Sequence, residues 1–506
     1  MGQESLLIHC AQTLIDKGHT VLGIISDAER IVAWANTQGV PVIAPPSSKR
    51  QRLADDLREP FDYFFSITNL RVIDAAVLNK AARGAINFHD GPLPRYAGLH
   101  APAWALMAQE VRHGISWHEM TAAVDAGAIV KQRLFPLRER ETSYTLNTHC
   151  YEAAIESFTE LIDELASEDV QRAAQPHTEA HYFSRHKRPS AVGTLHWSRP
   201  AAELDALVRA LDFGPVENPL AVAKFRLPNG TFVMVGRALP CDAGGDGAAP
   251  PPGTITAIDD DTLTVATGAG ALRLLELTCA QGLPLPIQSW ARKNQLMVGS
   301  RLPIVDTATA ARITTVHETL ARHEPFWVNR LAQLTPPPLP YANHSRATSP
   351  GDSPVGAAHA RASAPNDSLA PAGRDSSSPT YVCQIMTLPP EASRLNNDDL
   401  VAAVTAYISR IGGTGRFTVA YRDPTLAAAL DGAQGYFATH VPMRVRMGKQ
   451  ATFEGWRDAT TKELKRVRQR RSYARDTLLR YPPLAARTGQ ITNALRRVVI
   501  EQVASL

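Results

Sequence analysis

Cysteine is scarce in this sequence and shows no paired spacing. Only five cysteines occur among the 506 residues, at Cys10, Cys150, Cys241, Cys279 and Cys383. An odd number without a Cys-x-x-Cys pair predicts neither a disulfide framework nor a structural zinc site. The histidines and carboxylates show no metal-ligand spacing, so we expect no metal. This composition favours a reducing, cytoplasmic compartment.

Long apolar runs and a strong charge of one sign are also absent. No run approaches the roughly 18 residues of a membrane span, and the start MGQESLLIHCAQ lacks the basic segment of a signal peptide. The net charge is only +4, so binding to nucleic acid is not expected. A basic helix is expected at about 460–475. It is either a solvated face or a docking surface for an acidic protein.

Strand-like and helix-like segments alternate from residue 20 to residue 166. This rhythm predicts a doubly wound α/β domain over residues 1–182, with a parallel sheet covered by helices on both faces. The strands are expected at 20–25, 40–43, 63–68 and 85–89, and the helices at 28–38, 74–82 and 143–166.

The amino end departs from this pattern, because a helix over residues 6–15 directly follows the residues GQES. In a doubly wound fold the first, central strand normally precedes such a helix. We expect either a fold that begins with a helix or a start upstream of Met1, and we favour the second. Without that first strand, an interior sheet edge would have no partner.

Three further segments follow. Residues 186–305 combine one helix with short strand-like runs between Gly/Pro/Asp loops, which predicts a small β-barrel of the OB-like type. Residues 345–378 are mostly Ser, Ala, Pro, Gly, Asp and Arg, and this composition predicts a disordered linker. The flanking residues 312–344 and 379–506 are typical of an α/β lobe.

The stretch GAINFHDGPLPRYAG, residues 84–98, carries the clearest chemical signal. Residues i and i+2 of a strand face the same side, so Asn87 and His89 project together from the carboxyl end of a strand. Ligands of open α/β sheets bind at that end. Pro92 and Pro94 stiffen the loop that follows. We therefore expect a small polar platform beneath a rigid loop.

A carboxylate follows in the stretch SWHEMTAAVDAGAIVKQ, where the Asp-Ala-Gly sequence is typical of a tight turn. This turn can bring Asp125 back to Asn87 and His89. An amide that donates to an oxyanion, an imidazole that titrates near neutrality and a carboxylate together suit acyl transfer to an amine. Taken separately, these motifs are more often loop hydrogen bonding and an ordinary turn. For His118, which follows Trp117 on an expected strand, packing is favoured over a role in the acceptor site.

Three spaced pieces together resemble the formyltransferase family that uses 10-formyltetrahydrofolate. The family pattern is Asn-x-His, then a Leu-Pro-x-Tyr/Trp-x-Gly loop, then Asp-x-Gly-x-Ile. NFHDGPLPRYAG followed by VDAGAIV contains each fixed element. Residues 186–305 resemble the family's carboxyl-terminal domain. The resemblance implies an enzyme in which Asn87 and His89 stabilise a tetrahedral oxyanion, while Asp125 holds His89 and helps to remove the amine proton.

The same resemblance implies a formyl donor and a place for its pterin ring. The donor would be 10-formyltetrahydrofolate, bound without a metal at two loops near the strand ends. The residues expected to line this site are Ile67, Thr68, Asn69 and Leu70 in one loop and Val124, Ala126, Gly127 and Ala128 in the other.

The sequences of the motifs are most similar to those of the formylation domains that initiate nonribosomal peptide synthesis. Enzymes acting on methionyl-tRNA more often carry Ser-Leu-Leu-Pro after the histidine, where this chain has Asp-Gly-Pro-Leu-Pro at 90–94. HEPFWVNRLAQL and GYFATHVPMRVRM resemble the second lobe of a condensation domain, although the first lobe's His-His-x-x-x-Asp-Gly motif is absent. A carrier-bound aminoacyl group is the expected acceptor, and a carrier protein or adenylation domain the expected partner.

Two alternatives stay open at this point. The first keeps the chemistry but takes the amine of a sugar nucleotide or of methionyl-tRNA as the acceptor. The second is a non-catalytic interaction module of a synthetase, with a folate site that is degenerate because the first strand is missing. The intact set of Asn87, His89 and Asp125 argues against this second alternative.

Overall fold

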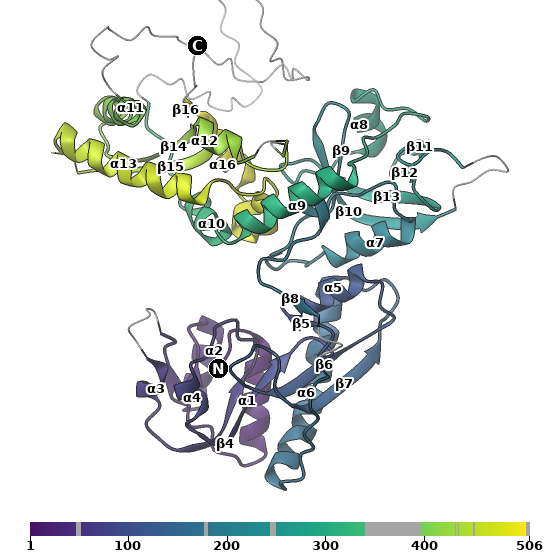
Figure 1. Cartoon of the computed structure of the whole chain (residues 1–506), viewed down its shortest axis with the longest axis vertical. Coiled ribbons are helices and arrows are strands. Elements are labelled where there is room, and N and C mark those ends of the chain that lie inside the picture. The colour runs from purple at the N-terminus through teal and green to yellow at the C-terminus, as the bar shows by residue number, and fades with distance from the viewer. Residues whose placement is uncertain are drawn as a thin grey trace, which may run out of the picture. The chain divides into compact units, whose positions relative to one another are not determined.

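The computed structural model describes residues 1–46, 52–176, 181–242, 249–339, 396–430, 432–433, 435–448 and 451–501. The chain divides into two compact units, which are described separately (Figure 1). The linker expected at 345–378 lies outside the described residues. The first unit consists of Met1–Arg226, Phe232–Thr319 and Leu479–Pro482, and the second of Leu227–Thr231, Leu320–Leu478 and Pro483–Leu506.

The amino-terminal part of the first unit is built on a four-stranded sheet with the order β3-β4-β6-β7, beside a separate parallel pair, β1-β2. Helices precede and follow the strands of this sheet. The elements in chain order are α1 (Ser5–Asp16), β1 (Ile24–Ile25), α2 (Glu29–Thr37), β2 (Val42–Ile43), α3 (Leu53–Asp56), β3 (Phe61–Ser66), α4 (Ala75–Leu78), β4 (Ala81–His89), β5 (Ala97–Gly98), α5 (Ala101–Met107), β6 (Arg112–Glu119), β7 (Ile129–Pro136), α6 (Ser143–Ala166) and β8 (Tyr182–Phe183).

Helix α6 confirms the helix expected at 143–166, and its start follows from a capping box. The Thr142 side chain accepts a hydrogen bond from the Thr145 backbone N–H at 3.3 Å. The Thr145 hydroxyl in turn accepts one from the Thr142 N–H at 2.9 Å. Two donors that the first turn of a helix leaves without partners are thereby satisfied.

The prediction of a wholly parallel sheet is wrong. Strands β3 and β4 are parallel, but β4 pairs antiparallel with β6, and β6 pairs antiparallel with β7. The seven residues of α5 extend only about 10 Å, whereas the nine residues of β4 extend roughly 30 Å. Because so short a helix cannot return the chain to the start of β4, β6 begins beside the end of β4 and runs back.

Two predicted elements are much shorter in the structure. The helix expected at 74–82 is reduced to the four residues of α4, because Ala81 already pairs with Phe61 as the first residue of β4. The strand expected at 20–25 is reduced to the two residues of β1, which pair only with the two residues of β2. In both cases the pairing partner, and not the local propensity, sets the bounds.

Met1 and Gly2 connect the two sheets by backbone hydrogen bonds. The Met1 amino group donates to Phe65 O at 2.8 Å, and Met1 O accepts from Ile67 N at 2.9 Å. Gly2 N donates to Ile25 O at 3.3 Å. Among the described residues these two fill the place between β1 and β3, where the expected first strand would run.

Alternation along β4 divides its side chains between two hydrophobic layers. Ile86 and Phe88 pack into a core formed with α1, α2 and α6, while Ala85 packs with Phe64 and the residues of α3 and α4. Burying each large apolar side chain contributes about 1.5–3 kcal/mol. Asn87 and His89 share the face of Ala85 and emerge where that second layer ends.

The rest of the first unit is β-rich. Its five-stranded sheet has the order β11-β12-β13-β10-β9, with every pairing antiparallel. Among the described residues the edge strands β9 and β11 do not pair, so pairing alone does not close the expected barrel. The elements are a 3-10 turn η2 (Ser190–Gly193), α7 (Ala201–Ala210), β9 (Lys224–Arg226), β10 (Phe232–Cys241), β11 (Ile255–Ile258), β12 (Leu263–Ala266), β13 (Ala271–Thr278), α8 (Ile287–Lys293) and α9 (Thr307–Ala321).

The second unit is an α/β lobe around β14, which pairs antiparallel with β15 and parallel with β16. The basic helix α13 begins and ends earlier than the expected 460–475. None of the described helices combines the length and apolar composition that a bilayer crossing requires. The elements are α10 (Glu324–Ala332), α11 (Asn397–Gly412), β14 (Arg416–Arg422), α12 (Pro424–Ala428), β15 (Val441–Arg446), α13 (Phe453–Arg470), α14 (Thr477–Arg480), α15 (Pro482–Ala485), α16 (Thr488–Arg496) and β16 (Val499–Glu501).

Candidate active site

Asn87 and His89 lie at the carboxyl end of β4, on the same face of the strand. His89 is buried, with 5% of its side chain exposed. Its Nε2 lies 2.6 Å from Tyr96 O, and because a carbonyl only accepts, this nitrogen carries a proton. The Nδ1 atom of His89 is consequently the ring nitrogen that remains for other groups.

Strand β6 places His118 directly opposite Asn87. The two residues are partners in the antiparallel pairing of β4 and β6, and His118 Nε2 lies 3.1 Å from the Asn87 amide nitrogen. The other ring nitrogen of His118 lies 2.9 Å from Glu119 O. The interpretation of His118 as a packing residue is therefore incomplete, because its ring is part of the polar cluster.

Asp125 reaches this cluster through a tight turn between β6 and β7. Its backbone is left-handed, with φ of +53°. A Cβ added to Gly127 would lie 1.9 Å from Glu119 O, so only glycine fits this close approach. The Gln175 side-chain amide donates to Asp125 O at 2.8 Å and to Gly127 O at 2.7 Å. These contacts hold the turn in one conformation.

The Asp125 carboxylate lies between the two histidines. Oδ1 is 3.4 Å from His118 Nε2, Oδ2 is 3.7 Å from His89 Nδ1, and Oδ2 accepts a hydrogen bond from Gly98 N at 2.8 Å. Burial opposes ionisation of this group, but hydrogen bonding to His118, the charge of His89 and the bond from Gly98 outweigh it and lower the pKa of Asp125. An ionised carboxylate is thus available at neutral pH.

A second carboxyl group, that of Asp90, approaches the same Nδ1 atom of His89 as Asp125 does. Its Oδ1 is 3.9 Å from His89 Nδ1. Burial raises the pKa of Asp90, the charge of His89 opposes this, and the charge of Asp125 adds to the increase. Two carboxyl groups with pKa values displaced in opposite directions around one imidazole are an arrangement typical of acid–base sites.

The loop after His89 is fixed by side chains of β6 and β7. Leu93 N donates to the Ser116 hydroxyl at 3.1 Å, and the Gln132 amide donates to Leu93 O at 3.0 Å. The Tyr96 ring stacks on Phe183, with centroids 5.7 Å apart. These contacts hold the loop in place, with Gly98 N against Asp125.

The expected pterin-binding residues lie on two loops at the same end of the sheet. Residues 67–70 follow β3, whose last residue, Ser66, pairs with Asn87, and residues 124–128 surround Asp125. Of the eight, Ile67 is buried, while Leu70 and Val124 expose 65% and 57% of their surfaces. The remaining five are Thr68, Asn69, Ala126, Gly127 and Ala128.

The site contains no group of ligands for a metal. Among the described residues, no set of three or more His, Cys, Asp or Glu side chains could hold an ion. The buried Cys150 is not activated as a nucleophile either, because burial raises its pKa well above the ordinary value. What the arrangement offers is amide donation, imidazole chemistry and one ionised carboxylate, which suit acyl transfer to an amine.

This α/β fold with an amide, two imidazoles and a carboxylate at a strand end is that of an acyl-transfer enzyme. Comparison with known proteins agrees: residues 35–162 match the family model for formyl transferase, and residues 189–295 match the model for the formyl transferase C-terminal domain. The chain belongs to the formyl transferase family. The expectation of a formyltransferase enzyme is confirmed.

Individual relatives match more than half of the chain. A methionyl-tRNA formyltransferase of Dechloromonas aromatica is 31% identical over 316 residues, which cover 60% of this chain and 97% of the relative. The methionyl-tRNA formyltransferase of Acidithiobacillus ferrooxidans is 30% identical over 265 residues, which cover 52% of this chain and 81% of the relative. Among solved structures, an N-formyltransferase from Helicobacter canadensis, in complex with folinic acid and dTDP-3-aminofucose, has 14% identity and a TM-score of 0.43, covering 55% of this chain and 97% of that one.

Proposed function

We propose that this enzyme transfers a formyl group from 10-formyltetrahydrofolate to the primary amine of an aminoacyl group held on a carrier protein. The observation that carries this proposal is the position of the Asp125 carboxylate between His89 and His118, with the Asn87 amide beside them. Such a cluster supplies both an oxyanion donor and a base. Formyl transfer to an amine requires these two functions and no covalent enzyme intermediate.

In the proposed reaction the amine nitrogen attacks the formyl carbon, and the carbonyl oxygen becomes an oxyanion. Asn87 donates a hydrogen bond to that oxygen. Because the Nε2–H of His89 is directed at Tyr96 O, His89 stabilises the oxyanion in its doubly protonated form, by donating from Nδ1–H. Asp125 accepts the proton that the amine loses. The bond from the formyl carbon to N10 of the folate then breaks, and that nitrogen takes up a proton as tetrahydrofolate leaves.

The pterin ring is proposed to bind between the loops at 67–70 and 124–128. Both loops end at the catalytic cluster, and their exposed side chains Leu70 and Val124 offer apolar surface to a flat ring. Backbone N–H and C=O groups of the same loops would form hydrogen bonds with the polar edge of the pterin. This placement puts the formyl donor within reach of Asn87 without any metal.

Two features support a carrier-bound acceptor. Asp90 and Gly91 replace the serine-containing sequence that is more usual in enzymes acting on tRNA, and Asp90 brings a second carboxyl group close to His89. The carboxyl-terminal residues resemble a condensation-domain lobe, which would belong beside a carrier protein or an adenylation domain. The methionyl-tRNA formyltransferases among the relatives favour methionyl-tRNA as the second candidate acceptor.

The test presents the purified full chain with 10-formyltetrahydrofolate and three acceptors in parallel. These are a set of aminoacyl carrier proteins, methionyl-tRNA and an amino-sugar nucleotide, and intact mass or hydrolysed product reports replacement of one amine hydrogen by formyl. Asn87→Ala serves as the inactive variant, and Asn79→Ala, an exposed asparagine after α4, as its matched control. Formylation of a carrier-bound amino acid by the wild type and by Asn79→Ala is the expected result.

Each other outcome rejects a stated part of the proposal. Formylation of methionyl-tRNA or of the sugar nucleotide alone would replace the acceptor and leave the chemistry intact. Full activity of Asn87→Ala would remove the amide from the mechanism. No transfer to any of the three acceptors, with the protein folded by circular dichroism, would overturn the choice of acceptor classes.

A further inference from the structure

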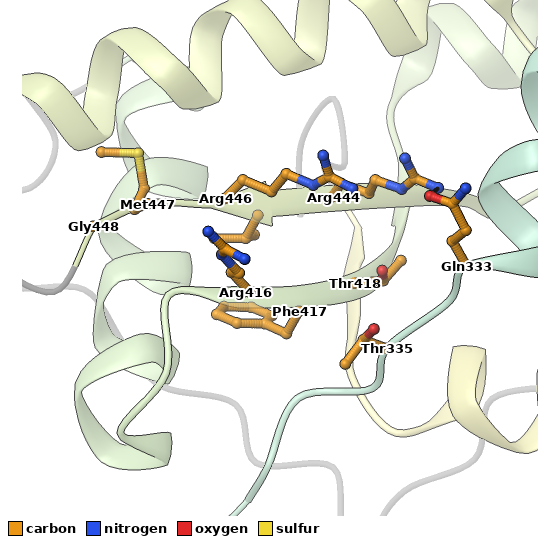
Figure 2. Close-up of a pocket in the computed structure, with 10 residues that line it drawn as sticks. Gln333, Thr335, Arg416, Phe417, Thr418, Arg444, Arg446, Met447 and Gly448 are labelled. Atoms are coloured by element: carbon orange, nitrogen blue, oxygen red, sulfur yellow. Dashed lines mark hydrogen bonds between the residues drawn. The ribbon is translucent and has the colours of Figure 1, made fainter.

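The second unit contains a cleft lined by basic and hydroxyl side chains. Its volume is about 450 Å³, a size that accommodates a small-molecule ligand. Figure 2 shows Arg416 from β14, together with Arg444 and Arg446 from β15, around the same hollow as the hydroxyl groups of Thr335 and Thr418. No carboxylate is among the residues that line it.

Two of these arginines oppose each other across the sheet. Arg416 and Arg446 are direct partners in the antiparallel pairing of β14 and β15, and both are exposed. Like charges in this position destabilise a strand pair. Within the described part of the chain, neither guanidinium forms an ion pair with a carboxylate. An anion bound between the two guanidinium groups would therefore reduce their repulsion.

The third arginine lacks part of its hydrogen bonding. Arg444 Nη2 donates to Asn329 O at 3.0 Å and to Gln333 Oε1 at 3.2 Å, but its Nε is buried without a partner. Burial lowers the pKa of Arg444, and the charges of Arg330 and Arg446 lower it further. The two hydrogen bonds from Arg444 Nη2 thus go to a backbone carbonyl and an amide oxygen, and neither acceptor is charged.

The nearest carboxylate does not neutralise the cleft. Glu463 is buried, with 11% of its side chain exposed, and is paired in a short contact with Arg330. Its carboxylate reaches Arg444 only at the backbone N–H, at 3.1 Å. The negative charge of Glu463 is therefore paired with Arg330. It does not pair with the guanidinium groups of the three arginines that line the cleft.

Protection of a bare sheet edge is the simpler explanation for exposed arginines. The edge of β14 is already occupied at this point, because Thr418 N donates to Thr335 O at 2.7 Å. Arg416 and Arg446 moreover belong to two strands that pair with each other. β15 is an edge strand of this sheet, but its outer edge is occupied at Arg444, whose N–H donates to Glu463 Oε1 at 3.1 Å. Edge protection also does not explain Arg416, which lies on the central strand β14.

We propose that this cleft binds a phosphate-bearing small molecule. Guanidinium groups bind phosphate oxygens in bidentate pairs, and the threonine hydroxyls can donate to the oxygens that remain. A phosphate or diphosphate carries more than one negative charge and several acceptors, which matches three arginines better than a single carboxylate does. A nucleotide and a phosphorylated pantetheine share this chemistry. The inference is independent of the formyl-transfer site.

The test measures binding to the full chain by calorimetry and by the shift in unfolding temperature, at constant ionic strength. The probes are inorganic pyrophosphate, ADP and 4′-phosphopantetheine. Arg416→Gln and Arg446→Gln are each expected to weaken binding by about tenfold or more, since hydrogen bonds to charged groups contribute about 1.5–3 kcal/mol. Arg410→Gln, at an exposed arginine of α11, is the matched control and should bind as the wild type does.

The unliganded variants provide a check on folding. Because each substitution removes one of two opposed charges, Arg416→Gln and Arg446→Gln should unfold at the wild-type temperature or above it. Tighter binding of ADP would identify a nucleotide, and tighter binding of 4′-phosphopantetheine would identify the pantetheine phosphate. Equal affinities of all variants, a shift reproduced by sodium chloride, or failure of all three probes to bind would overturn the proposal.

Discussion

His118 Nε2 lies 3.4 Å from Asp125 Oδ1 and, at the same time, 3.1 Å from the Asn87 amide nitrogen. The Nδ1 atom of His118 faces the Glu119 carbonyl at 2.9 Å and must carry a proton. Nε2 therefore has a proton only when the ring is charged. In the neutral ring, Nε2 accepts a hydrogen bond from the Asn87 amide. In the charged ring, Nε2–H donates to Asp125, and the N–H of Asn87 that faced Nε2 becomes available to the substrate. The protonation of His118 is thus linked to the donor that Asn87 offers.

Removing either the amide or the carboxylate should abolish most activity. Asn87→Ala and Asp125→Asn are each expected to lower kcat/KM by roughly 10²-fold or more. A preorganised oxyanion donor such as Asn87 contributes that much to the transition state, and so does a positioned general base such as Asp125. Steady-state kinetics provide the measurement, with whichever of the three proposed acceptors is formylated in the assay. Asn79→Ala and Asp55→Asn are the surface controls. Near-wild-type rates in either site variant would exclude that residue from the mechanism.

His118→Leu should change the pH dependence as well as the rate. Hydrogen bonding to His118 helps to lower the pKa of Asp125, so its loss raises that pKa. Because Asp125 acts as a base only when ionised, the acid limb of the kcat/KM profile should move to higher pH. A rate loss of about tenfold or more is expected at the optimum.

Two further variants separate a positioning role of His118 from a structural one. His118→Gln restores a hydrogen-bonding group and should recover part of the rate, and His19→Leu, at an exposed histidine, should leave the profile unchanged. An acid limb that stays in place in His118→Leu would show that His118 does not control the ionisation of Asp125.

Local patterns were sufficient for much of the fold and for the placement of Asn87, His89 and Asp125. Apolar spacing identified α6 with its exact bounds, and alternation placed Asn87 and His89 on one face of β4, because both signals are contained in consecutive residues. The turn at Asp125 was recognised from its Asp-Ala-Gly sequence, and the structure brings its carboxylate to the two histidines.

The antiparallel direction of β6, and the contacts that follow from it, could not be predicted from local sequence patterns. The antiparallel pairing of β4 and β6 depends on the short length of α5, and this pairing alone sets His118 opposite Asn87. The sequence around His118, with Trp117 before it and Glu119 after it, does not distinguish a packing histidine from one in a polar site. The one signal that could have singled it out is its place in the alternating run that leads into the Asp125 turn.

Asp90→Asn should stabilise the protein at neutral pH. Burial raises the pKa of Asp90, so the folded state binds a proton more tightly than the unfolded state does. The free energy of unfolding of the wild type therefore falls as pH rises through the folded pKa, whereas the amide has no such dependence. Unfolding temperatures at pH 7 and pH 4 measure this: the advantage of Asp90→Asn should be larger at pH 7. Asp55→Asn is the control, and a lower unfolding temperature of Asp90→Asn at pH 7 would contradict the argument.

In the second unit, Arg468 holds two carboxylates from different elements. Its guanidinium donates to both carboxylate oxygens of Asp398, at 2.7 and 2.8 Å, and to Asp423 Oδ2 at 2.7 Å. Asp423 is buried, with 1% of its side chain exposed, and it also caps α12 by accepting from Leu426 N at 2.9 Å. Burial opposes ionisation of Asp423, but the bonds from Arg468 and its neighbours lower its pKa.

Arg468→Ala should destabilise the second unit by about 3 kcal/mol, because it leaves the buried Asp423 carboxylate without its cation. Asp423 has a lowered pKa in the folded state, so its stabilising effect is present above the ordinary carboxyl pKa and is lost as pH falls through the folded value. The variant should lose part of this acid dependence. Differential scanning calorimetry of the full chain at pH 7 and below pH 4 measures both effects. Arg457→Ala, at a half-exposed arginine of the same helix with only 3.9 Å ion pairs, should change the unfolding temperature little. Equal destabilisation by the two variants would show that Arg468 acts through helix α13 in general and not through Asp423.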